Sequence, residues 1–348
     1  MAVFATTTRE LLTHDIMRVH LIGGIYGKPP QYRQTVNMTV ETLLERLLIE
    51  VGVDLSTGHH RWPVPRDAEL VHLHQLGRLH RSVWLHPHAL VYTPHAAWRD
   101  PRRTKVMYGR LLARRASGIV ALSDAEAAFQ VGNLAISPHK VTVIQNGADA
   151  SVFFLTPPSA RPAVPPIKLL YVGQLIERKR LDVLLRAMAA VRGEVDLQLT
   201  LVFHNAALQS ELRQLSNDLG LEGWVSFAGA KTPEEIARVH GDHQVLVLLS
   251  TGEGLPGCIT EALLCGTLVI AQAVGGVPDQ LAGTDSCLLQ NPDVPAVADA
   301  FRLLPATLQA HTDEVAEQVR RQTIERFSAH TMLRAHLDLY HRVLRGEL

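Results

Sequence analysis

The chain has 348 residues, of which 47% are hydrophobic and 20% charged, a globular balance with enough apolar material for two cores. Lys plus Arg and Asp plus Glu both number 34, so no global field favours a nucleic acid or a membrane as partner. Three cysteines are too few for a disulfide framework and indicate a reducing cytoplasm. No apolar run approaches the ~20 residues of a spanning helix.

Residues 1–16 are expected to be an N-terminal extension without the pattern of a secretory signal. From Arg18 onward, short apolar segments alternate with polar loops and amphipathic stretches, and a helix is expected over 35–50. The segments predict strands at 18–22, 53–57, 69–74, 89–95, 118–123 and 141–144. Short strands that alternate with helices indicate a parallel sheet covered on both faces.

Five prolines within 156–166 cannot continue a helix or a central strand, and they predict a linker. Strands are then expected at 167–172, 197–203, 224–228, 244–249 and 267–271. Helices are expected from about 179, over 207–219, within 232–240, near 258 and from 295 onward.

The fold class is therefore α/β, with two Rossmann-like doubly wound parallel-sheet domains that face each other across a cleft. We expect an N-terminal domain over 17–155, the linker, and a C-terminal domain over 167–327. Residues 328–348 are expected to form a helix that packs back towards the N-terminal domain. In such sheets ligands bind at the carboxyl ends of the strands.

The segment EGLPGCITE, residues 253–261, follows one of these strands. Gly254, Pro256 and Gly257 allow a sharp turn into a helix whose free N–H groups suit a phosphate. Glu261 lies about one turn into that helix, where it could accept hydrogen bonds from a ribose diol. The alternative is a glutamate that only complements the helix dipole.

Two further loops weaken that alternative. QAVGGVPD, residues 272–279, is a second glycine-rich turn after a strand, and two such turns make an anion-binding concavity. Arg178, Lys179 and Arg180 are expected at the start of a helix, where cations oppose the dipole. A phosphate-bearing ligand explains these cations, and the alternative is a solvated basic turn.

EGLPGCITEALLCGTLVIAQAVGGVPD resembles the signature of retaining glycosyltransferases of GT-B architecture, family 4. YVGQLIERKRLDVLLRAM is similar to the same family's strand, loop and helix with a phosphate-binding lysine. The segments GG, VHLH, VYTPH, VALSD and VTVIQNGADASVF of the first domain follow the family's order. The resemblance extends from Arg18 to about Phe327.

The resemblance implies roles for individual residues. Glu261 would hold the ribose of a nucleotide sugar, and Glu253 would face the donor sugar. Lys179 would neutralise the diphosphate. The implied catalytic residues are His95, Glu253 and Lys179, with His95 lining the reaction centre. The implied donor-binding residues are Gly24, Gln174, Arg178, Lys179, Gly254, Leu255, Pro256 and Glu261.

Two positions depart from the family pattern. Gln174 stands where the family usually has an arginine that completes a two-cation clamp, so Arg178 or Arg180 would have to supply the second charge. The loop His204-Asn205-Ala206-Ala207 lacks the usual glycines, which leaves the donor base and sugar open.

Histidines and basic residues gather in the first domain. His72 and His74 point to the same face of a strand, a spacing that can bind zinc, but no partner recurs at ligand spacing. We therefore expect no metal and no other cofactor. The basic, partly apolar segment 98–115 could contact an anionic membrane, and the alternative is a solvated helical face.

The sequence predicts a metal-independent hexosyltransferase that moves a sugar from a nucleoside diphosphate to an acceptor hydroxyl with retention. The acceptor is a carbohydrate, a lipid-linked molecule or a small molecule, and no nucleic acid is expected. The alternatives are a nucleotide-sugar epimerase, a glycoside hydrolase, or an inactive sugar-nucleotide-binding partner subunit, which the missing arginine keeps open.

Overall fold

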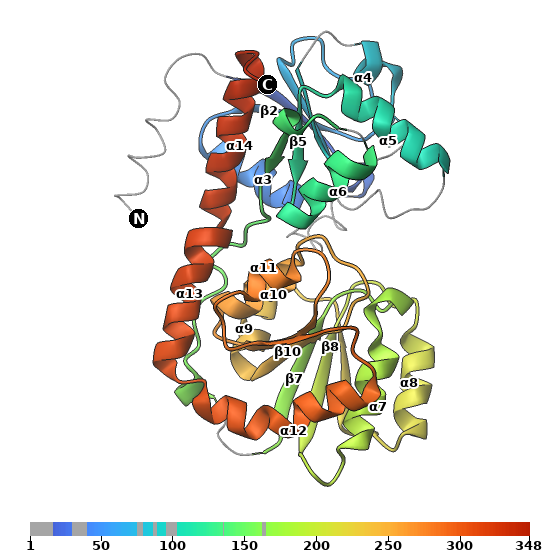
Figure 1. Ribbon diagram of the computed structural model, residues 1–348, viewed down its shortest axis with the longest axis vertical. Helices are drawn as coiled ribbons and strands as arrows, with labels where there is room; N and C mark the ends of the chain where they lie inside the picture. Colours follow the sequence, from blue (N-terminus) through green and yellow to red (C-terminus); the bar gives the residue numbers. More distant parts are fainter. Residues whose placement is uncertain are drawn as a thin grey trace. The chain divides into compact units, whose positions relative to one another are not determined.

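The computed structural model describes residues 17–29, 40–74, 79–85, 89–94, 103–134, 136–161 and 165–348. The chain divides into two compact units. One comprises the residues up to Asn146 together with Ala329–Leu348, and the other comprises Gly147–Ser328. Each unit is a parallel sheet with helices packed against it (Figure 1).

The described residues of the first unit form a six-stranded sheet in the order β2-β1-β3-β4-β5-β6, and every pair is parallel. Its strands are β1 (Arg18–Ile22), β2 (Asp54–Gly58), β3 (Leu70–His74), β4 (Ala89–Thr93), β5 (Gly118–Ala121) and β6 (Val141–Val143). Its helices are α3 (Val40–Glu50), α4 (Arg81–Leu85), α5 (Arg103–Arg115), α6 (Asp124–Leu134) and α14 (Ala329–Leu344).

The strands and helices of the first unit bury the apolar residues of their sequence pattern. All five residues of β3 are buried, as expected for a central strand covered on both faces. On α3, Leu43, Leu44, Leu47 and Leu48 recur at helical spacing and form its buried face.

The second unit holds a six-stranded parallel sheet in the order β12-β11-β10-β7-β8-β9 within the described residues. Its strands are β7 (Ile167–Val172), β8 (Leu197–Val202), β9 (Val225–Gly229), β10 (Val245–Leu248), β11 (Leu268–Gln272) and β12 (Cys287–Leu289). Its helices are α7 (Leu181–Ala190), α8 (Gln209–Asp218), α9 (Pro233–Asp242), α10 (Gly257–Leu264), α11 (Val277–Leu281), α12 (Val294–Ala310) and α13 (Asp313–Phe327).

The helices of the second unit form two layers. α7 packs against α8 and α12, whereas α10 packs against α11 and α13 (Figure 1). Between these layers the sheet is almost wholly apolar, and the four residues of β10 are all buried. This order places β7 in the middle of the sheet, with β10 on one side and β8 on the other. The loops that follow these three strands therefore share one edge.

The fold class is confirmed, with differences in detail. β12 was not predicted, because CLL is a short, half-buried edge strand without a long apolar run. β2 begins one residue later than expected. Residues 1–16 and 35–39 lie outside the described residues.

The residues before the expected linker and at its start belong to the second unit and form hydrogen bonds within it. The Ala148 N–H donates to Phe327 O at 3.0 Å, and the Thr156 N–H donates to Cys265 O at 3.2 Å. Arg320 donates to Ala150 O at 2.9 Å. Across the described ranges, no helix combines the length and the apolar character needed to cross a membrane.

Candidate functional site

The carboxyl edge of the second sheet brings Lys179 and Glu253 together. Lys179 ends a 3-10 turn, η5 (Glu177–Lys179), in the loop after β7, and Glu253 lies in the loop after β10. The Lys179 Nζ donates to Glu253 Oε1 at 2.6 Å, although the two residues are 74 positions apart. Their side chains are only 10% and 11% exposed, so this ion pair is largely shielded from water.

Arg178 completes a small charge cluster. Its guanidinium lies 3.3 Å from the same Glu253 oxygen and also donates to the carbonyl of Gly252. Burial alone would raise the pKa of Glu253, but the Lys179 ammonium outweighs it, with help from Arg178, and the pKa lies below its ordinary value. Glu253 is therefore ionised at neutral pH. Two cations and one carboxylate leave a single net positive charge.

The loops after β10 and β11 are tightly joined. The Gly276 N–H donates to Gly254 O at 2.7 Å. Gly275 has a φ of +57°, and a Cβ there would stand 2.0 Å from Glu253 O. Only glycine fits this close approach, so Gly275 lets the backbone of Glu253 take its position.

A buried glutamine fixes the start of α10. Gln280 Nε2 donates to Pro256 O at 3.1 Å and to Thr260 Oγ1 at 2.9 Å. Pro256 is the N-cap of α10, and Leu255 beside it is buried. This turn and its helix therefore have a defined position at the sheet edge.

Glu261 lies in α10 about one turn from its first residue, as predicted. A Cβ at Gly257 would lie 3.6 Å from the Glu261 Oε1, so the carboxyl group reaches back towards the helix N-terminus. Burial raises the pKa of Glu261 to about 7. An isolated carboxylate here is costly unless a ligand supplies hydrogen bonds, which is a reason to regard it as a binding group.

Gln174 lies next to His204. The loop of His204 was noted in the sequence only because it lacks the family's usual glycines, and no role was predicted for His204. Gln174 Nε2 is 3.3 Å from His204 Nε2, and the Tyr171 hydroxyl donates to Gln174 O at 2.6 Å. Burial and the nearby Lys179 both lower the pKa of His204. The available signal was its position directly after a strand of the second domain.

The basic turn differs from the expectation. Arg178 and Lys179 were predicted at the start of a helix, but they lie in η5, and α7 begins at Leu181. Arg180 separates the two elements in a left-handed conformation with a φ of +52°. Arg180 is the N-cap of α7, and Arg178 and Lys179 lie in the turn directly before it, so the cations still lie at the positive end of this helix, which they do not stabilise. The buried Lys179–Glu253 pair is a second observation that favours a site at this turn.

The remaining predicted residues are in the first unit. Gly24 is the N-cap of the 3-10 turn η1 (Ile25–Gly27), with a φ of −65° that any residue can adopt. His95 lies outside the described residues. The segment 98–115 is described from Arg103, where α5 begins.

His72 and His74 lie in β3, and their rings are 4.1 Å apart. His72 binds the Tyr340 hydroxyl at 2.6 Å through Nδ1 and Thr93 Oγ1 at 2.8 Å through Nε2. His72 is thus occupied by hydrogen bonds inside the first unit. Within the described ranges, no three His, Cys, Asp or Glu side chains are grouped so as to hold a metal ion.

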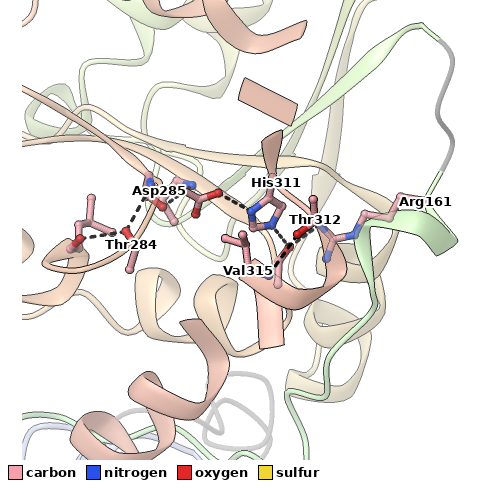
Figure 2. Close-up of polar contacts among 10 residues, drawn as sticks. Arg161, Thr284, Asp285, His311, Thr312 and Val315 are labelled. Atoms are coloured by element: carbon pink, nitrogen blue, oxygen red, sulfur yellow. Dashed lines mark hydrogen bonds and ion pairs between the residues drawn. The ribbon is translucent and has the colours of Figure 1, made fainter. Parts of the chain in front are cut away.

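A cavity of about 980 Å³ lies at the opposite, amino edge of the second sheet. Its lining includes Ile167, Gln244 and His311. His311 is held by Asp285 at 2.6 Å and by Gly266 O at 3.1 Å, with Arg161 and the start of α13 beside it (Figure 2). Ligands of parallel sheets bind at the carboxyl ends of the strands, so we place the functional site at Glu253 and not in this cavity.

The chain matches two family models. The one described as Glycosyltransferase Family 4 matches residues 2–152, and the one described as Glycosyl transferases group 1 matches residues 166–305. The chain is 29% identical over 313 residues to a D-inositol 3-phosphate glycosyltransferase of Saccharomonospora viridis, which covers 79% of this chain and 70% of that protein. It is 24% identical over 300 residues to a phosphatidylinositol N-acetylglucosaminyltransferase subunit of Arabidopsis thaliana, covering 82% and 64%.

Solved structures share the fold at low sequence identity. The sucrose-phosphate synthase of Thermosynechococcus elongatus has a TM-score of 0.77 at 20% identity, covering 95% of this chain and 100% of that one. HepE of Anabaena, in complex with UDP and glucose, has a TM-score of 0.73 at 16% identity, covering 93% and 99%. The two matched models, the parallel sheets and these neighbours agree: the chain belongs to glycosyltransferase family 4 (group 1), with the GT-B architecture.

Proposed function

We propose that the protein is a retaining hexosyltransferase that moves a sugar from a nucleoside-diphosphate sugar to an acceptor hydroxyl. The observation that carries this proposal is the shielded Lys179–Glu253 pair beside the α10 turn that holds Glu261. The cations and the helix N-terminus suit the diphosphate of a donor, and the two carboxylates, Glu253 and Glu261, suit the hydroxyls of its sugar and its ribose.

The residues have distinct roles in this proposal. Lys179, Arg178 and the α10 N-terminus bind the diphosphate, while Glu253 accepts hydrogen bonds from the donor sugar. The ionised Glu261 accepts hydrogen bonds from the ribose hydroxyls. Because Lys179 and Glu253 already bind each other, the donor enters a preorganised pair whose side chains need little reordering.

In the transfer step the bond between the sugar C1 and the diphosphate oxygen breaks, and a bond from C1 to the acceptor oxygen forms on the same face. The acceptor proton passes to the departing diphosphate. Negative charge grows on the diphosphate during this step, so Lys179 stabilises the transition state more than the bound donor. The proposal assigns no metal ion to this role.

The acceptor is proposed as a polyol phosphate or a lipid-linked molecule, since the names of two relatives contain inositol 3-phosphate and phosphatidylinositol. A surface of the first unit suits a lipid-linked acceptor. On α5, Met107 and Leu111 are 68% and 54% exposed, and Arg110 and Arg114 on the same face are exposed too. An apolar face flanked by cations can dock on an anionic membrane, at the cytoplasmic side in this proposal.

The test begins with a thermal-shift screen of UDP-, GDP- and ADP-sugars, because a specific ligand raises Tm according to its occupancy. The donor found is then incubated with inositol 3-phosphate, phosphatidylinositol vesicles or no acceptor, and the anomeric configuration of the product is read by NMR. A glycosylated acceptor with the donor's configuration is expected. Free sugar or an isomerised donor would indicate a hydrolase or an epimerase, and tight binding without turnover would indicate an inactive partner protein.

A further inference from the structure

His204 is held against the phosphate-binding turn by the backbone. The Leu175 N–H donates to Asn205 O at 2.9 Å, and the Leu208 N–H donates to Leu175 O at 3.1 Å. Leu175 itself is fully buried, so the loops after β7 and β8 are fastened to each other. The loop that carries His204 therefore lies at the same edge as the turn that carries Lys179, and β8 lies on the side of β7 opposite to β10. His204 is close enough to Lys179 for the ammonium to lower its pKa.

The charge around the diphosphate site is low for its proposed ligand. Lys179 and Arg178 both bind Glu253, which cancels one of their charges. Of the groups on the surrounding elements, Lys179 in η5 acts on His204, and Lys231 follows the neighbouring strand β9. A diphosphate diester carries two negative charges, one more than the net positive charge of the Arg178, Lys179 and Glu253 cluster. Arg180 caps α7 next to this cluster, so a protonated His204 would add to the cations of η5, Arg180 and Lys231.

The Gln174 side chain can form a hydrogen bond with either protonation state of His204, because its amide carries both a donor and an acceptor. Its amide N–H group can donate to the neutral His204 Nε2, which is the contact at 3.3 Å. When the imidazole is protonated, the amide can turn and offer its oxygen as acceptor. An arginine at position 174 has only donors and would hold His204 neutral. Gln174 and His204 together can thus replace a permanent cation with a titratable one.

We propose that His204, supported by Gln174, is a proton-linked contact for the diphosphate of the donor. The neutral imidazole of the free protein takes up a proton when the diphosphate binds, and its imidazolium N–H then donates to a phosphate oxygen. The inference builds on the proposed function, because it names a further group of the same donor site.

The expected pH dependence follows from the two states. His204 has a lower pKa in the free protein than in the complex, so the affinity for donor is highest at low pH and falls as pH rises through the pKa of the complex. Glu261 acts in the opposite direction, because its carboxylate must be ionised to accept from ribose. The measurement must therefore compare variants that differ only at His204.

The experiment is calorimetry with the nucleoside-diphosphate sugar that stabilises the wild-type protein. The phosphates of such a donor do not titrate near neutral pH. Titrations at pH 6, 7 and 8, in buffers with different ionisation enthalpies, give the affinity and the protons taken up. His204→Gln keeps a hydrogen-bond donor without charge. His139→Gln, an exposed histidine of the first unit, is the matched control.

We expect the donor-linked proton uptake of the wild-type protein to be lost in His204→Gln and to be unchanged in His139→Gln. The affinity should fall about tenfold at pH 6, the worth of one charge-assisted hydrogen bond, and by less than about threefold at pH 8. Gln174→Arg should also lower proton uptake, while it keeps or improves affinity at pH 8.

Unchanged proton uptake in His204→Gln would overturn the inference, and so would an equal loss of affinity at both extremes of pH. An equal loss with the matching nucleoside monophosphate would instead assign His204 to the base or ribose. The Tm of each unliganded variant reports whether it folds. If the wild-type protein binds no nucleotide sugar at all, the proposed function fails and not merely the role of His204.

Discussion

Replacing Lys179 by Ala tests the proposed site most directly. The change removes an ammonium that lies 2.6 Å from Glu253 Oε1, in a pair whose side chains are only 10% and 11% exposed. Removing one partner of a buried pair costs about 3–5 kcal/mol of stability, because the other charge stays buried. Arg178 remains 3.3 Å from the same oxygen, so we expect the lower end of that range.

The same change should slow catalysis more than it weakens donor binding. The diphosphate gains charge as the sugar leaves, and one preorganised electrostatic group contributes about 10²–10³ in rate. Single-turnover rates and donor Kd are measured for Lys179→Ala, Glu253→Gln and the double variant. Lys168→Ala, at the amino end of the same strand β7, is the matched control.

The double variant separates stability from chemistry. Lys179→Ala with Glu253→Gln no longer buries an unpaired carboxylate, so its Tm should recover, whereas its rate should stay low. Adding Gln174→Arg to Lys179→Ala should recover part of the rate, because it returns one cation to this edge. If Lys179→Ala transfers sugar at the wild-type rate while donor is saturating, the phosphate site lies elsewhere and the assignment of the donor is wrong.

Three further outcomes are expected. The pKa of Glu261 is raised by burial from 4.5 to about 7, so ionisation destabilises the folded protein, and its contribution to stability falls as pH rises from about 4.5 to 7. Glu261→Gln should therefore raise Tm above pH 7 yet weaken nucleotide binding by ~1.5–3 kcal/mol; calorimetry showing unchanged affinity would refute the ribose role. Transfer should survive EDTA, and a loss that only Mn²⁺ or Zn²⁺ restores would contradict the metal-independent reaction. Co-sedimentation with anionic liposomes should fall for Met107→Ser with Leu111→Ser, and also in 1 M salt, where exposed charges are screened beyond ~3 Å. Equal recovery with neutral liposomes would indicate that α5 is a solvated face.

The order of strands and helices could be predicted from the sequence, because the hydrophobic repeat of a strand and that of a helix both depend on residues close together in the chain. β7 and β1 begin and end at the predicted residues, since continuous apolar runs bounded by polar loops leave little choice of conformation. The α10 turn was also predictable, because Gly254, Pro256 and Gly257 encode it directly. Short, half-buried β12 carries too weak a pattern and was missed.

The sequence alone determined the fold class, the family resemblance and the loops in which to search for a site, because each depends on residues that are neighbours in the chain. Only the tertiary structure brought Lys179 to Glu253, 74 residues away, and His204 to Gln174. The structure also showed that Arg178 and Lys179 lie in a 3-10 turn directly before α7, and that burial raises the pKa of Glu261. Those results depend on the order of strands in the sheet and on burial, since parallel strands joined by long crossovers set which loops meet and how much water reaches them.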